Sequence, residues 1–105
     1  MSIRSERREF LTHLDTEIER LQGAFDRLVA ESTRDNDIET LARAERAKKL
    51  VAEKGTTLDT LLEETSNLDD DAWTGRRDDV EAAWREYREA VERTRLEFER
   101  ADELA

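Results

Sequence analysis

The sequence contains no cysteine and no proline, and only three of its 105 residues are glycine. The absence of cysteine excludes disulfides, cysteine-ligated zinc sites and thiol catalysis. No apolar run exceeds three residues, so we expect neither a membrane-spanning segment nor a signal peptide. Leu, Ile, Val and Phe together account for only 22 residues, which predicts a thin hydrophobic core.

Charge, in contrast, is abundant. The chain carries 28 acidic and 18 basic side chains, for a net charge of -10 at pH 7. Such a surface repels phosphate backbones and anionic lipids. We therefore expect no nucleic-acid partner and no membrane partner.

A chain that is 44% charged and free of proline is typical of long helices. Two clusters of short polar residues, at 32–37 and 66–71, are the breaks in the helical pattern. The sequence therefore predicts three helices, near residues 3–32, 37–66 and 70–103.

Each break supplies residues that begin a helix. In the first break, Asn36 precedes Glu39 by three residues, which approximates a capping box. In the second, Asp69 is the expected N-cap, with Leu68 and Trp73 as the two ends of a hydrophobic staple.

Apolar residues follow helical spacing in the first and third predicted helices, and these residues are the candidate core or interaction face. The third helix has the clearer pattern, a heptad repeat interrupted once, at Arg77. The second helix has a weaker stripe, but its alanines between residues 42 and 52 predict a close helix approach. The face of the first helix consists of Phe10, Leu14, Ile18, Leu21 and Phe25. The face of the third consists of Trp73, Val80, Trp84, Tyr87, Val91 and Phe98.

Connections of about five residues between long helices make sequential helices antiparallel. We therefore predict an all-α fold, an up-down-up three-helix coiled coil that forms a single domain over residues 1–105. Because its core is a narrow seam, self-association would widen it, and we expect a homo-oligomer or a complex with another protein.

The third helix carries a recognisable motif. Residues 71–73 are Asp-Ala-Trp, and after six intervening residues, residues 80–84 are Val-Glu-Ala-Ala-Trp. This arrangement resembles the pattern D-A-W-x6-V-E-x-A-W near the C-terminus of small, highly charged bacterial coiled-coil proteins. The resemblance implies a helical coiled-coil protein, and some such proteins are described as stress-response proteins. It implies no catalytic residues.

The same region also resembles a calcium loop. Asp70, Gly75 and Glu81 occupy positions 1, 6 and 12 of an EF-hand, but positions 3 and 5 hold Ala72 and Thr74, which do not supply the usual carboxylate ligands. A helix cap followed by a coiled coil explains these residues without a metal. We expect no metal and no cofactor.

Two further arrangements have a chemical alternative. Glu9, His13 and Glu17 share one helix face and could hold a divalent metal weakly, but an exposed histidine between carboxylates is the favoured interpretation. Trp73 and its aromatic neighbours on the third helix could form a stacking platform, but their heptad spacing favours core packing. No serine lies in a glycine-rich elbow, and we expect no enzyme activity.

The sequence thus favours a non-enzymatic, cytoplasmic structural or interaction protein that acts by association of helix faces and, by resemblance, is associated with stress. The alternative is a reversible lipid- or client-binding module whose helices open and lay their apolar faces on a surface.

Overall fold

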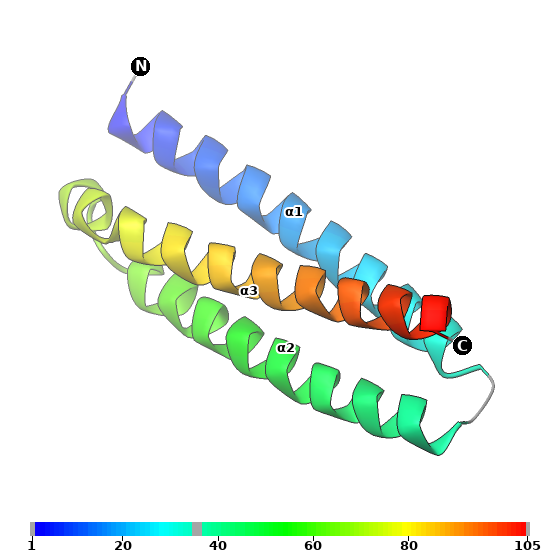
Figure 1. Cartoon of the computed structure of the whole chain (residues 1–105). Coiled ribbons are helices and arrows are strands. Elements are labelled where there is room, and N and C mark those ends of the chain that lie inside the picture. The colour runs from blue at the N-terminus through cyan, green and yellow to red at the C-terminus, as the bar shows by residue number, and fades with distance from the viewer. Residues whose placement is uncertain (1, 35–36, 105) are drawn as a thin grey trace.

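The computed structural model describes residues 2–34 and 37–104, with side chains described as far as residue 100. It contains three long helices, α1 (Ile3–Ser32), α2 (Ile38–Ser66) and α3 (Asp70–Leu104), and no strand occurs in this part of the chain (Figure 1). The helices form an up-down bundle, so the predicted all-α fold class is confirmed.

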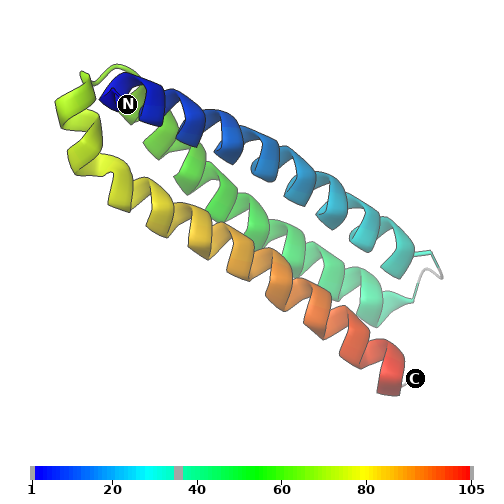
Figure 2. The ribbon, with the colours of Figure 1, turned by 90° about the horizontal axis from the view of Figure 1, so that it is seen from above.

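The bundle is narrow and elongated, measuring 53 × 21 × 17 Å. Its length is close to that of one helix, because about 30 residues at 1.5 Å each span ~45 Å. The end of α1 and the start of α2 lie at one end of the bundle, and the α2–α3 turn lies at the other end, beside the start of α1 (Figures 1 and 2). The start of α1 is therefore far from the start of α2 and close to a turn about 60 residues further along the chain.

The start of α3 follows the sequence expectation. The carboxylate of Asp69 accepts a hydrogen bond from the backbone N–H of Ala72 at 2.8 Å, and the Asp69 carbonyl accepts one from the N–H of Trp73 at 2.9 Å. Asp69 is thus the N-cap of α3, as predicted, and its charge also suits the positive end of the helix dipole. Leu68, the other end of the predicted staple, is half-buried.

The start of α2 corrects the sequence expectation. The N-cap is Asp37, not Asn36, and its carboxylate accepts bonds from the backbone N–H and the hydroxyl of Thr40, at 3.2 and 3.0 Å. Asn36 itself lies outside the described residues. The cap moves by one residue because a carboxylate can accept both Thr40 bonds and also interacts favourably with the helix dipole.

The core is a seam along the bundle axis to which all three helices contribute. Alanines are prominent in it, and those that are buried all belong to α2 and α3. The buried apolar residues are Leu14, Phe25, Val29, Ala44, Ala47, Val51, Leu58, Trp73, Val80, Ala83, Tyr87, Ala90, Val91 and Phe98.

The three helices do not contact each other equally. α2 and α3 pack closest, α1 contacts chiefly α3, and α1 and α2 touch least. Side-chain size accounts for this difference, because buried Ala44, Ala47, Ala83 and Ala90 let two backbones approach, whereas every buried residue of α1 is larger than alanine. The predicted close approach of the alanine-rich half of α2 is therefore made with α3, and the side of the bundle between α1 and α2 stays comparatively open.

Candidate functional site

The residues predicted to form the core or interaction face lie along the seam. Trp73, Val80, Tyr87, Val91, Phe98, Leu14 and Phe25 are buried. Phe10, Ile18, Leu21 and Trp84 are half-buried and pack against the core. Sequence reasoning missed the buried Val29, Ala83 and Ala90, and it missed Arg7.

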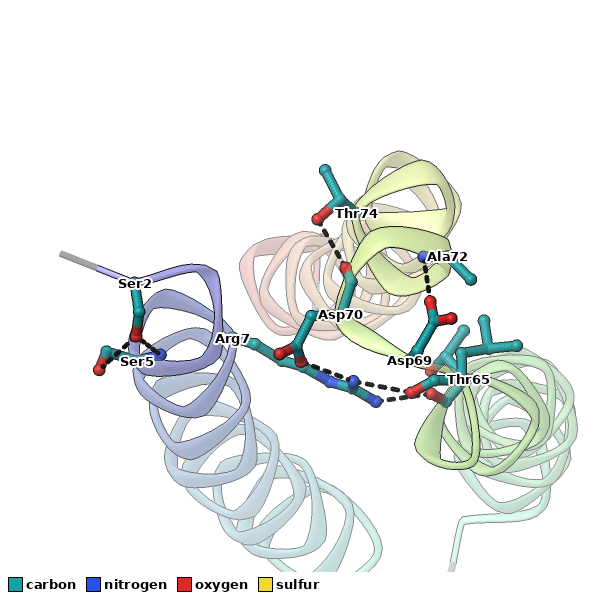
Figure 3. Close-up of polar contacts among 9 residues, drawn as sticks. Ser2, Ser5, Arg7, Thr65, Asp69, Asp70, Ala72 and Thr74 are labelled. Atoms are coloured by element: carbon teal, nitrogen blue, oxygen red, sulfur yellow. Dashed lines mark hydrogen bonds and ion pairs between the residues drawn. The ribbon is translucent and has the colours of Figure 1, made fainter.

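Arg7 joins all three helices at one end of the bundle (Figure 3). From α1, its guanidinium donates to the carbonyl oxygens of Thr65 at 2.8 Å and Leu68 at 2.9 Å, and to the Asp70 carboxylate at 3.2 Å. The Arg7 side chain is only 14% exposed. One side chain of α1 therefore holds the end of α2, the following turn and the start of α3.

The chemistry of a helix end explains why an arginine is suited to this place. The last carbonyls of a helix lack intrahelical donors and carry the negative end of the dipole. The last turn of α2 contains no basic residue of its own, so the cation comes from α1. A guanidinium presents several donors in a planar fork and can serve two carbonyls and a carboxylate at once.

We call the contacts of Arg7 with Thr65, Leu68 and Asp70 the junction. Aromatic rings pack directly against it. The rings of Phe10 and Trp73 meet edge to face at 5.6 Å, and the Arg7 guanidinium lies 5.5 Å from the Trp73 ring. Arg77, which interrupts the heptad in sequence, lies 4.8 Å from the Phe10 ring and pairs with Glu81 at 3.2 Å. Its position in the stripe is therefore occupied by a cation that covers aromatic rings, an arrangement that is favourable in itself.

A hollow of about 390 Å³ opens between α1 and α2 in the middle of the bundle. Phe25, Val51 and Tyr87 line it from three different helices, and its α2 side also includes Ala52 and Gly55. The structure explains why residue 55 is a glycine, because a Cβ there would lie only 3.3 Å from Cε2 of Tyr87. The glycine makes room for the tyrosine ring, which comes from α3.

The Tyr87 hydroxyl is held in its neutral form. Burial of the phenol raises its pKa above the ordinary value of 10.0, the nearby Gln22 side chain opposes this rise, and the charges of Asp26 and Asp59 add to it. On the exposed surface of α3, Arg95 pairs with Glu92 and Glu99, and the hydrogen bond from Arg95 lowers the pKa of Glu92. These three side chains form an ion-pair network on the exposed surface of the helix.

The remaining sequence alternatives can be located in the same structure. The calcium-like residues Asp70, Gly75 and Glu81 lie in the continuous helix α3, not in a loop, and Asp70 is paired with Arg7. His13 is exposed. Among the described residues, no three His, Asp or Glu side chains are grouped closely enough to hold a metal ion.

Comparison of the chain with protein-family models, with curated proteins and with solved structures finds no match. The resemblance of the two-tryptophan helix to bacterial coiled-coil proteins therefore stays a prediction. Within residues 2–34 and 37–104, no helix is both long enough and apolar enough to cross a membrane.

One sequence signal could have found Arg7. The apolar stripe of α1 continues backwards from Leu14 through Phe10, and the next heptad position is residue 7. A charged residue at a stripe position indicates either a break in the core or a specific buried partner. The partner is not readable from the sequence, because it lies 58 to 63 residues away.

Proposed function

We propose that this chain is a non-enzymatic protein-association module that acts through its helix faces, with a second copy of itself as its partner. The observation that carries the proposal is the open side of the bundle. α1 and α2 have few contacts with each other, and the hollow between them has a largely apolar floor of Phe25, Val51 and Tyr87. We name this side of the molecule the α1–α2 groove.

The position of the groove between two helices favours a helix as its occupant. Two helices that flank a groove can pack a further helix against both, at interaxial distances of about 8–10 Å. A bundle of three helices thereby gains the fourth position of the common four-helix arrangement. Such an addition would widen a seam that is thin because the chain has few large apolar residues.

The proposal is tested by measuring mass against concentration, by light scattering after size exclusion, for a matched pair of variants. Ala52 is exposed and lines the groove, whereas Ala82 is exposed on α3 and does not. Ala52→Glu and Ala82→Glu add the same charge to an exposed helical alanine. We expect self-association of the wild-type chain and of Ala82→Glu, and its loss in Ala52→Glu.

A wild-type chain that stays monomeric over the whole concentration range would contradict the proposal. So would equal behaviour of the two variants, because association would then not involve the groove. Vesicle flotation examines the lipid-binding alternative, for which robust co-flotation of the wild-type chain is the expected sign.

A further inference from the structure

We infer that the groove side of α2 is a self-complementary surface on which α2 of a second copy lies antiparallel. This inference rests on the proposed function and adds the contact helix, its direction and its register. It arises from four residues of α2 that line the same hollow: Lys48, Ala52, Gly55 and Asp59.

The spacing of these four residues is symmetric along the helix. Lys48 and Asp59 are eleven residues apart, which is about three helical turns, so both point to the same side. Ala52 and Gly55 lie between them at equal distances from the two ends. The centre of the set falls between residues 53 and 54.

A two-fold axis through that centre, perpendicular to α2, pairs unlike residues. Lys48 of one copy then faces Asp59 of the second copy, and by symmetry the same ion pair forms a second time at the other end. Ala52 faces Gly55 of the second copy. A parallel arrangement in register would instead place Lys48 against Lys48 and Asp59 against Asp59, so charge complementarity selects the antiparallel direction.

The sizes of the side chains fit this contact as well as their charges do. Ala52 is exposed and carries only a methyl group, and Gly55 adds no side chain of its own beside the Tyr87 ring that packs against it, so α2 itself contributes little bulk to the middle of the contact. Small residues at the crossing point allow two helix backbones to approach closely. Lys48 and Asp59 are both exposed, and the Lys48 ammonium pairs only with exposed Glu45, at 3.4 Å, in the described part of the chain. Its side chain can therefore turn toward a partner.

Charge reversal with rescue tests the register. Lys48→Asp and Asp59→Lys each replace two attractions per dimer with two repulsions, and we expect each to weaken dimer affinity about tenfold in sedimentation equilibrium. The double variant Lys48→Asp/Asp59→Lys restores both pairs with reversed polarity, so its affinity should return to within about twofold of wild type. Lys49→Asp is the control, because it makes the same charge change at the adjacent exposed residue, which does not line the hollow.

The outcomes separate this inference from the proposed function. A wild-type chain that assembles, with a double variant no better than the single variants, overturns the antiparallel register and leaves self-association standing. A Lys49→Asp chain as weak as Lys48→Asp also overturns the register, because net charge would then explain the loss. A wild-type chain that never assembles overturns both. Far-UV circular dichroism of each variant shows whether the helices are retained.

Discussion

Replacing Arg7 with methionine tests the role of the junction at the end of the bundle. Methionine keeps a long, flexible apolar stem but removes every donor and the charge. The variant loses the bonds to the carbonyls of Thr65 and Leu68, the ion pair with Asp70 and the contact with the Trp73 ring. We expect a marked loss of stability, because the Arg7 side chain is mostly buried.

The size of the effect follows from these contacts. A hydrogen bond to a charged group is worth ~1.5–3 kcal/mol net, and a cation over an aromatic ring adds about 0.5–2 kcal/mol. The contributions are not additive, since the freed carbonyls regain water and Thr65 O also accepts a bond from the Leu68 N–H at 3.2 Å. We therefore expect a loss of about 2–4 kcal/mol in the free energy of unfolding, or a fall in Tm on the order of 10–20 °C.

Arg8→Met is the matched control, because Arg8 is the next residue on α1 and is exposed. Its loss should stay within about 0.5 kcal/mol. Thermal and urea unfolding followed by circular dichroism gives both values. Hydrogen exchange adds a spatial test. Because α1 is packed less closely against α2 and α3 than these two helices are against each other, the amides of α1 should lose protection first in Arg7→Met.

Equal stabilities of the Arg7→Met and Arg8→Met variants would refute the reasoning, since the junction would then contribute nothing beyond an exposed arginine. Arg7→Lys refines the result. A lysine keeps the charge but lacks the planar fork, so it should recover less than half of the lost stability.

Three further predictions concern the two tryptophans, Tyr87 and two of the glycines. Trp73→Ala should lower the free energy of unfolding by about 3–5 kcal/mol, and Trp84→Ala by less, because Trp73 is 2% exposed whereas Trp84 is only half-buried. Equal losses in urea unfolding would contradict this. Because the pKa of Tyr87 is raised above 10.0, its contribution to stability is complete below pH 10 and is lost as the pH rises through the raised value. Tyrosinate absorbance of this single tyrosine should therefore have its midpoint above the ordinary value, and a midpoint at that value would exclude a buried phenol. Gly75→Ala should stabilise the chain by about 0.5–1 kcal/mol, because nothing lies near a Cβ there. Gly55→Ala should stabilise it less or destabilise it, because the added Cβ meets the Tyr87 ring. Thermal unfolding of the two variants measures both effects, and equal gains would contradict the packing of the Tyr87 ring against Gly55.

The helices and their directions could be predicted from the sequence because their causes are local. Caps act within four residues, as at Asp69, and heptad spacing along one segment identifies the face that becomes buried. Short connections then leave antiparallel packing as the simple solution. The error at Asn36 concerns one residue at a helix end, where two adjacent residues can both act as a cap.

The candidate site could be predicted only in part, because its geometry depends on pairs of residues that are distant in sequence. The stripe identified Tyr87 as a core residue, but nothing local shows that its ring lies against Gly55 of another helix. In the same way, Arg77 only interrupts the heptad in the sequence, and the fold is needed to show that its guanidinium lies over the Phe10 ring.

Composition and spacing alone determined that this chain forms three charged rods with a thin apolar seam, because helix formation depends on neighbouring residues. Tertiary structure alone decided that Arg7 closes the end of α2 and that the open side of the bundle lies between α1 and α2. Both depend on which side chains meet across helices. The small alanine side chains allow α2 and α3 to pack closely, whereas the larger buried residues of α1 keep it further from α2.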